Sequence, residues 1–507
     1  MRGRLLAAVA MAAIAWGGTA LAQTQAPVRA PLPVAPVPTG PTQSLREALV
    51  QTYNSNPTIM AERQSLRQLD ETVAIVRAGS RPQVSATAGV NQDVVTHNLG
   101  NNGRDLTASI DLSLPLYAGG RVRNGIRAAD TRVEAGRANL RSTEGGIFTE
   151  AVAAYMDVIR DRSIVQLNRN QVSVLDTNLM ATRDRFEVGD LTRTDVAQSD
   201  ARLALARSNL ALAQGRLEAS EENYRRVIGQ LPPDLAPPPP LPPLPSSPDQ
   251  ATEVALANNA DLASIAAQAR AAGFDVRVAR GERLPTISAV NSNRYTNLLG
   301  SADNLTGGTG LVPNSTTSSG IGLSLRLPLY QGGAAGARVR QAQAFRSQLL
   351  EQTIGIERLV VSNVRAAYAA YVAANDAIES NTIAVAANEL ALEGTRAEQS
   401  VGTRNILDVL NAEQELLNSQ VLLVTARRDA YVAGFQLLNA MGMAEADDLN
   451  LDGGPLYDPL VNYDRYSRSW SDWDDGPRPR PVATRTVPAD AVSPVTPVLN
   501  SVTQPRQ

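Results

Sequence analysis

Two segments of the chain alternate regularly between apolar and polar residues. Apolar side chains stand at every second position from Leu106 to Leu116, and again from Ile321 to Leu329. A period of two is the pattern of a strand with one apolar and one polar face. A looser alternation precedes each segment, at Gln83–Val95 and at Thr286–Tyr295. The sequence therefore predicts two β-hairpins with strands of about ten residues, which is the length of a tilted membrane strand.

The pattern becomes helical after each predicted hairpin. No proline stands between Gly120 and Gly189, so we expect a nearly continuous helix there, about 100 Å long. After Gly189, and again after Gly402, apolar residues recur every seven positions, which indicates the seam of a coiled coil. These two stripes are Val196, Leu203, Leu210, Leu217 and Tyr224, and Val409, Leu416, Leu423, Ala430 and Leu437.

The two halves of the chain are copies of one plan. The stretch LPLYAGG at Leu114–Gly120 returns as LPLYQGG at Leu327–Gly333, and the matching register continues to Gly229 and Gly442. This predicts an internal duplication. In each copy the stretch joins a strand to a helix: its proline is expected to end the strand, its tyrosine suits an interfacial aromatic girdle, and its glycine pair lets the backbone turn. The junction residues are Tyr117, Gly119, Gly120, Tyr330, Gly332 and Gly333.

The chain divides into six segments. Arg2 and Arg4 precede the apolar run Leu5–Trp16, and Ala20–Ala22 is a small-residue cleavage site, so residues 1–22 are predicted to be a secretory signal peptide. Proline-rich stretches favour stiff, extended connectors over folded elements. The other predicted segments are a proline-rich start at 23–43, the first repeat at 44–230, a proline-rich linker at 231–249, the second repeat at 250–443, and a mostly disordered tail at 444–507.

Two tryptophans stand in that tail, Trp470 and Trp473. They are interpreted either as a docking motif or as part of a solvated tail. Beyond the signal peptide no apolar run approaches the 18 or so residues of a membrane helix. If the hairpins lie in the membrane, the chain must assemble with copies of itself, because the smallest membrane barrels use eight strands and unpaired edges in lipid are costly.

The composition removes several classes of function. The chain has no Cys, a single His at position 97, and no Lys among its 47 basic residues. Zinc sites, His-based catalytic triads and the Walker lysine therefore lack their residues. The net charge of −3 gives no basic footprint for nucleic acid. We expect neither enzyme activity nor a cofactor, because no motif brings a nucleophile, a base and an electrophile together.

Three stretches carry a family resemblance: the duplicated LPLY-x-GG, RFEVGDLTRTDV at Arg185–Val196 and SVGTRNILDVLNAEQELLNSQ at Ser400–Gln420. Through them the chain resembles the TolC family of outer-membrane channel-tunnels. The resemblance covers about Ser44 to Gly442. It implies an α+β protein of the bacterial outer membrane: a homotrimer with one shared twelve-stranded barrel, and long coiled-coil helices that form a periplasmic tunnel with a gated end.

The resemblance also assigns roles near the two helix reversals. Gly189 and Gly402 are expected in turns at the periplasmic tip. Arg404 and Asp195, with Thr194 beside them, match family residues that link neighbouring helices and hold the entrance closed. The other interpretation is that these charged residues are ordinary solvated helix residues, which contribute about 0–1 kcal/mol.

A further match concerns the lumen. Asp408 matches a residue whose carboxylates ring the narrowest point. Asn411 stands where the family often has a second acid, so the ring would carry three charges instead of six. Gln399 stands where a tyrosine of the closing link is common, which leaves one hydrogen bond of that link in doubt.

The predicted function is a passive duct. The resemblance implies an adaptor and an inner-membrane transporter as partners, either an ABC transporter or a proton-driven pump. Type I protein secretion is the first interpretation, small-molecule efflux is the alternative, and a periplasmic coiled-coil adaptor is the alternative from a different class. Paired amphipathic strands favour the duct, since an adaptor does not need them.

Overall fold

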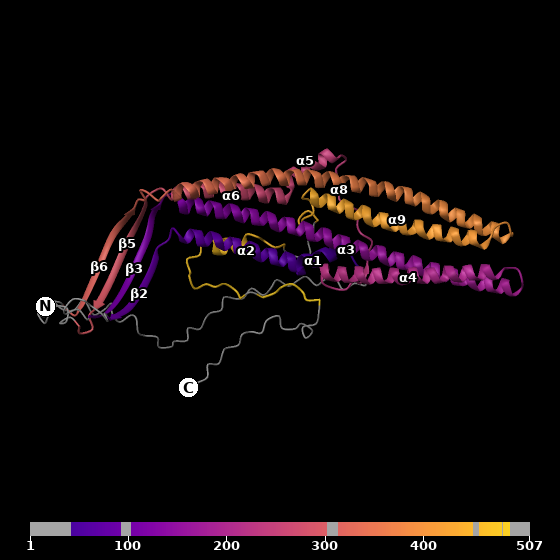
Figure 1. Cartoon of the computed structure of the whole chain (residues 1–507), viewed down its shortest axis with the longest axis horizontal. Helices are drawn as coiled ribbons and strands as arrows, with labels where there is room; N and C mark the ends of the chain where they lie inside the picture. The colour runs from indigo at the N-terminus through magenta and orange to yellow at the C-terminus, as the bar shows by residue number, and fades with distance from the viewer. Residues whose placement is uncertain (1–41, 93–102, 302–312, 450–455, 479, 487–507) are drawn as a thin grey trace, which may run out of the picture. The chain divides into compact units, whose positions relative to one another are not determined.

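The two hairpins join in one antiparallel sheet. The computed structural model describes residues 42–92, 103–301, 313–449, 456–478 and 480–486, all within the unit Gly40–Gln507 (Figure 1). The strand order is β2-β3-β5-β6, so the first hairpin meets the second through β3 and β5. The strands are β2 (Gln83–Gln92), β3 (Arg104–Ala118), β5 (Thr286–Asn297) and β6 (Ser315–Arg326).

Both predicted hairpins are present, with different ends. Pro115 does not end its strand as predicted, because β3 continues to Ala118 through a β-bulge between Pro115 and Tyr117. In the second copy Leu327 and Leu329 lie beyond β6. The reason is pairing: β5 begins at Thr286, opposite Arg326. The residues after Arg326 therefore have no partner strand among the described residues. The signal peptide, His97 and positions 93–95 of the first predicted strand lie outside the described residues.

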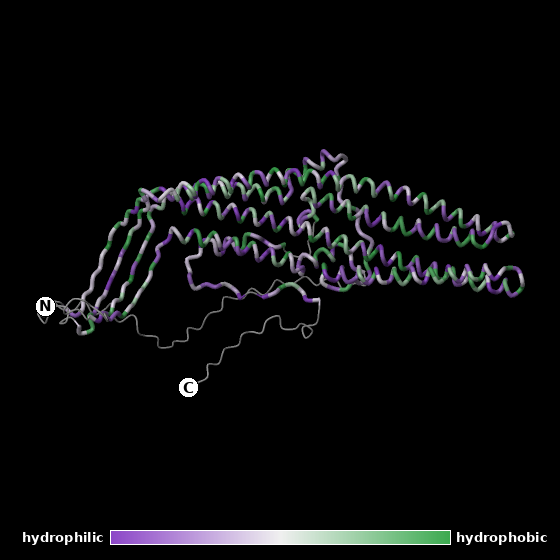
Figure 2. The backbone as a smooth tube through the Cα atoms, in the orientation of Figure 1, coloured by the Kyte–Doolittle hydropathy of each residue, from purple (hydrophilic) through white to green (hydrophobic). Residues whose placement is uncertain are grey.

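The sheet has an apolar and a polar face. Leu114 of β3, Ala289 of β5 and Leu323 of β6 lie side by side on one face. On the other face Ser292 donates a hydrogen bond of 2.5 Å to Asp111. Figure 2 shows hydrophobic and hydrophilic residues intermixed along the strands and the long helices. The alternation in the sequence therefore corresponds, as predicted, to strands with one apolar and one polar face.

Four long helices continue from the sheet. α3 (Arg121–Glu187) and α8 (Ala334–Ser400) each have 67 residues, which corresponds to about 100 Å. α4 (Arg193–Ile228) returns along α3, and α9 (Ile406–Ala440) returns along α8. Figure 1 shows the four strands at one end of α3 and α8 and the helix reversals at the other. The predicted long helices are confirmed.

In the described part of the chain, no helix combines the length and the apolar character needed to cross a membrane.

Shorter elements complete each copy. Ser44 caps the first short helix in a capping box with Glu47, and Asn56 and Asn259 cap equivalent helices of the two copies. These elements are β1 (Thr42–Gln43), α1 (Leu45–Ser55), α2 (Pro57–Ala78), β4 (Asp234–Leu235), α5 (Pro248–Asn258), α6 (Ala260–Gly281) and α10 (Val461–Tyr466); β1 pairs with β4 in parallel.

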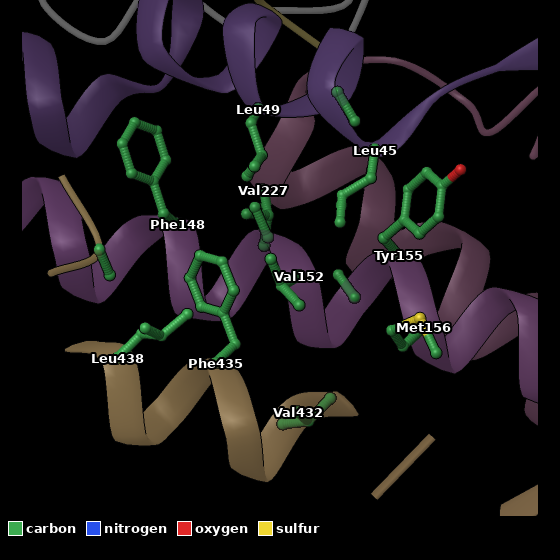
Figure 3. Close-up of a cluster of buried hydrophobic side chains, with 14 of the residues drawn as sticks. Leu45, Leu49, Phe148, Val152, Tyr155, Met156, Val227, Val432, Phe435 and Leu438 are labelled. Atoms are coloured by element: carbon green, nitrogen blue, oxygen red, sulfur yellow. The ribbon is translucent and has the colours of Figure 1, made fainter. Parts of the chain in front are cut away.

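The main core lies near the middle of α3. Figure 3 shows Phe148 and Val152 of α3 among side chains from α1, α4 and α9. The Tyr155 hydroxyl shares its one proton between the carbonyl oxygens of Gln43 in β1 (2.9 Å) and of Ala236 just after β4 (2.6 Å), which fixes both strands to this core. Residues of both copies meet here, so this cluster ties the duplicated halves together.

The C-terminal tail differs from the expectation of a mostly disordered segment. Its described part contains α10, and the Tyr457 amide donates a hydrogen bond of 2.9 Å to the Tyr53 hydroxyl. Tyr463 donates one of 2.9 Å to Asp130 and packs beside Leu66 and Val73. These contacts are made by isolated aromatic residues and not by a regularly repeated apolar face. For this reason the sequence of the tail shows no apolar period.

Candidate functional site

The two helical hairpins reverse at glycines. Gly189 has a φ of +85° between α3 and α4, and Gly402 has a φ of +79° between α8 and α9. Apart from the glycine and its chain neighbours, no atom of the described residues lies within 4 Å of a Cβ built at either position. The left-handed backbone, and not crowding, is therefore the reason for glycine at both turns.

Apolar side chains hold the two hairpins together near these turns. Leu175 and Leu179 of α3, Leu203 and Ala206 of α4, and Leu410 of α9 form one buried cluster. The heptad stripe of α4 and the first turns of α9 therefore meet α3 in a common seam. The α3–α4 and α8–α9 hairpins therefore pack against each other near their helix reversals.

Polar side chains cross the same seam. Arg202 of α4 donates a hydrogen bond of 2.8 Å to the amide oxygen of Asn411 of α9. Glu413 of α9 is only 3% exposed and accepts hydrogen bonds from Asn178 of α3 (3.2 Å) and from Arg396 of α8 (2.9 Å). A buried carboxylate is costly unless it is paired and hydrogen-bonded, so Glu413 favours the arrangement in which α3, α8 and α9 stay together.

Asp195 has a local partner. It forms a capping box with Thr192: the Thr192 hydroxyl donates to the Asp195 carboxylate at 2.7 Å, and the Thr192 amide donates to it at 2.9 Å. These hydrogen bonds, the side-chain one first, lower the pKa of Asp195. Thr194 is exposed in the first turn of α4.

Arg404 also finds partners in its own hairpin. Its Nε donates to Glu398 at 2.8 Å, and its Nη1 lies 3.8 Å from the Asp408 carboxylate. The hydrogen bond to Glu398, followed by the charges of Glu398 and Asp408, raises the pKa of Arg404. Among the described residues, the ion-pair partners of Arg404 are Glu398 and Asp408 of its own hairpin, so the expected role of Arg404 and Asp195 in linking neighbouring helices stays a prediction.

The remaining ring residues are accessible. The Asp408 side chain is 43% exposed at the start of α9, and Asn411 is exposed one turn later. Both lie on the helix that Glu413 ties to its neighbours. The segment 408–413 thus combines exposed polar groups with a buried anchor.

Four residues of this site were missed in the sequence: Asn178, Arg202, Arg396 and Glu413. One signal was available, because Glu413 lies four positions after Val409 and three before Leu416. A carboxylate on the apolar face of a helix calls for a buried partner. The identity of the residues that pair with Glu413 could not be predicted from this spacing.

The strand-to-helix junctions of the two copies differ in their surroundings. Gly119 has a φ of +62°, and a Cβ there would stand 2.5 Å from the Gly281 carbonyl oxygen, so β3–α3 and α6–β5 approach closely at this point. Tyr117 is 44% exposed and Tyr330 is 89% exposed. The other junction glycines, also with positive φ, are Gly120 (+73°), Gly332 (+59°) and Gly333 (+83°).

Comparisons with known proteins agree with this fold. The outer membrane efflux protein family matches residues 48–230 and 251–443, more than half of the chain. The outer membrane efflux protein BepC of Brucella suis is 34% identical over 84% of this chain and 91% of its own length. The outer membrane protein TolC of Vibrio cholerae is 27% identical over 81% of this chain and 94% of its own length.

A solved structure gives the same result for the fold. The CmeC outer membrane channel of Campylobacter jejuni superposes with a TM-score of 0.69, covers 84% of this chain and 89% of its own, and is 15% identical. The resemblance seen in the duplicated motifs is thereby confirmed. The chain belongs to the outer membrane efflux protein family, and its place is the bacterial outer membrane.

Proposed function

We propose that three copies of this chain form a passive duct through the outer membrane. The observation that carries the proposal is the four-stranded sheet, whose outer strands β2 and β6 are fully exposed edges. A sheet with one apolar and one polar face suits a barrel wall between lipid and water. Open edges are not tolerated in lipid, so the edges must be paired by neighbouring copies.

The duplication supports a specific register for that pairing. β3 pairs with β5, and in the duplicated plan β6 corresponds to β3 and β2 corresponds to β5. Leu112 lies opposite Asn291, and the equivalent positions are Leu325 and Ala88. The neighbouring pair, Ser113 and Val290, corresponds to Arg326 and Thr87. We therefore propose that β6 of one copy pairs with β2 of the next in this register.

Cysteine cross-linking tests the register, since the chain has no native Cys. Two double variants are compared, Leu325→Cys with Ala88→Cys and Arg326→Cys with Thr87→Cys. Opposite pairs alternate between wide and narrow spacing in antiparallel sheets, so one of the two should form a disulfide between copies. The control is Leu325→Cys with Val84→Cys, four residues out of register. Cross-linked trimers in the control alone would contradict the proposal.

The proposed gate lies at the helix reversals. Arg202–Asn411 and Asn178–Glu413 tie the two hairpins of one chain together. Asp408 would contribute one carboxylate per copy to a ring in the lumen, and Asp195, Thr194 and Arg404 would act between copies. The turns at Gly189 and Gly402 would face a periplasmic adaptor and an inner-membrane transporter, which supply the energy that a passive duct lacks.

For the load, we propose protein export of the type I class. Support comes from AprF of Pseudomonas aeruginosa, an alkaline protease secretion protein that is 25% identical over 68% of this chain. Efflux of small molecules is the second candidate, and the efflux protein BepC favours it. Both loads require the same architecture, so the fold does not distinguish them.

Deletion of the gene separates the two loads. Under the first proposal, one or a few proteins disappear from the culture medium and accumulate in cells, and a plasmid copy restores them. Proteins in the medium are measured by mass spectrometry, and drug susceptibility is measured in the same strains. An unchanged set of secreted proteins together with increased drug susceptibility would replace protein export by efflux.

A further inference from the structure

The described C-terminal tail runs beside α2 toward the sheet. Near the start of α2, the guanidinium of Arg63 lies 4.9 Å from the ring centroid of Tyr457. Further along, Asn462 donates a hydrogen bond of 3.1 Å to Asp70. Beyond the end of α2, Arg81 donates one of 3.1 Å to the carbonyl of Arg468. The residue numbers of α2 and of the tail rise together along these contacts. The tail therefore runs parallel to α2 as far as the end of α2, where β2 begins.

The tail then returns to where α2 begins. Arg225 near the end of α4 donates a hydrogen bond to the carbonyl of Thr486. Thr484 and Thr486 share a pocket with Ser55, the last residue of α1, and Pro57, the first residue of α2. Figure 1 shows this excursion as the yellow trace beside α2. The described residues between Arg468 and Thr484 therefore form the far end of a loop directed toward the sheet.

Two tryptophans stand at that far end. The guanidinium of Arg81 lies 4.5 Å from the ring centroid of Trp470, and Arg81 precedes β2 by only two residues. Trp470 is 70% exposed and Trp473 is 94% exposed. Three residues span at most about 10 Å, so Trp473 stays near the same level. Both indoles are thus presented at the point where the strands begin.

The surroundings are those of a lipid interface. Ser80, the residue before Arg81, shares a pocket with Leu116 and Tyr117 at the end of β3. At the equivalent end of the second copy, Leu329 is 88% exposed and Tyr330 is 89% exposed. Exposed apolar and aromatic groups therefore lie at both strand-to-helix junctions, at the same level as the tail tryptophans.

The segment that carries the tryptophans has no net charge as a whole, although its acidic residues, Asp472, Asp474 and Asp475, all flank Trp473. The segment from Arg465 to Arg478 contains three Arg and three Asp. A nucleic acid or an acidic partner would call for a basic excess, which is absent here. Indole, with its apolar ring and one N–H donor, is the side chain enriched at membrane–water interfaces.

We propose that Trp470 and Trp473 insert into the headgroup region of the periplasmic leaflet and hold the C-terminal tail to the membrane. This proposal rests on the placement of the strands in the membrane given under the proposed function. The partner is a phospholipid surface without a requirement for anionic lipid, because the segment has no net charge. The tail becomes an extension of the barrel's interfacial aromatic band.

Tryptophan fluorescence tests this directly. The chain has three tryptophans, and Trp16 lies in the predicted signal peptide, so Trp470 and Trp473 are the indoles of the mature protein. The protein is reconstituted in phosphatidylcholine vesicles with ordinary or brominated acyl chains. We expect a blue-shifted emission, loss of most of the fluorescence in brominated vesicles, and little effect of added salt. Unquenched emission typical of water-exposed indole would overturn the proposal.

Two control variants show whether an unquenched wild type contradicts only the insertion of the tail tryptophans or also the proposed placement of the strands in the bilayer. Both are made in a Trp470→Phe/Trp473→Phe background. Tyr330→Trp should be quenched by brominated lipid, because it reports the barrel rim. Val188→Trp, at the distant helix reversal where Val188 is 80% exposed, should not be quenched. If Tyr330→Trp is quenched and the wild type is not, only the tail proposal fails; if neither is quenched, the strands are not in the bilayer.

Discussion

At the scale of single residues, Arg63 is a buried cation with an unusual set of neighbours. Its guanidinium lies 4.2 Å from the ring centroid of Tyr53 and 4.9 Å from that of Tyr457. Its Nη2 is 3.8 Å from the carboxylate of Glu144, which is 8% exposed. Burial raises the pKa of Glu144 to about 7, although the Arg63 charge acts in the opposite direction.

This pair predicts a pH-dependent stability. The ordinary pKa of a glutamate is 4.5, so as pH rises the unfolded chain loses this proton before the folded chain does. The contribution of Glu144 to the free energy of unfolding is therefore complete below pH 4.5 and is lost as pH rises to about 7. The wild-type Tm should fall between pH 5 and pH 8 by more than the Tm of Glu144→Gln. Glu62→Gln, a less buried position, is the control. Parallel falls in all three proteins would contradict the assignment.

The same residue scale shows where sequence reasoning stopped. Thr192 and Asp195 have the spacing of a capping box, a local signal that the sequence contains in full. Glu413 is different, because a heptad pattern identifies a helix face but not the partners on it. Asn178 is 235 positions away from Glu413 in the chain, and that proximity depends on how two hairpins pack.

At the scale of elements, long periodic segments were the most predictable. The 67-residue helices α3 and α8 follow from the absence of proline and from the glycines at their ends. Strand ends were less predictable, because Pro115 lies inside β3 while the equivalent Pro328 lies beyond β6. Two copies of one motif differ here because β5 covers one and not the other. The local sequence of a strand does not show how far the neighbouring strand extends, so it could not predict where each strand ends.

The turn glycines give a prediction at this scale. Gly189→Ala places a Cβ on a left-handed residue and should destabilise the α3–α4 hairpin by about 1–2 kcal/mol. The control is Gly215→Ala inside α4, where a Cβ also has open space. That substitution should stabilise the helix by up to about 1 kcal/mol. Denaturant midpoints measure both variants. Changes of the same sign would mean that the backbone conformation at Gly189 is not the controlling factor.

At the scale of the whole assembly, the proposed gate combines two kinds of interaction. Glu413 holds α9 against α3 and α8 within one chain. The Asp408 side chain is 43% exposed and lies 3.8 Å from Arg404 of its own hairpin, and in the proposed ring it would act on ions. In the proposed gate, holding the helices and selecting ions are therefore separate tasks of neighbouring residues. Substitution of each should change a different property of the channel.

The last prediction uses that separation in planar bilayers. Asp408→Asn removes the ring charges and should lower cation selectivity, because a narrow carboxylate ring favours cations. Glu413→Ala removes the buried anchor and should raise the single-channel conductance, because α9 loses its hydrogen bonds to Asn178 and Arg396. Glu415→Ala, exposed on the same helix, is the control and should change neither property. If Glu413→Ala trimers remain intact with unchanged conductance, the seam around Glu413 stabilises the helices without closing the duct.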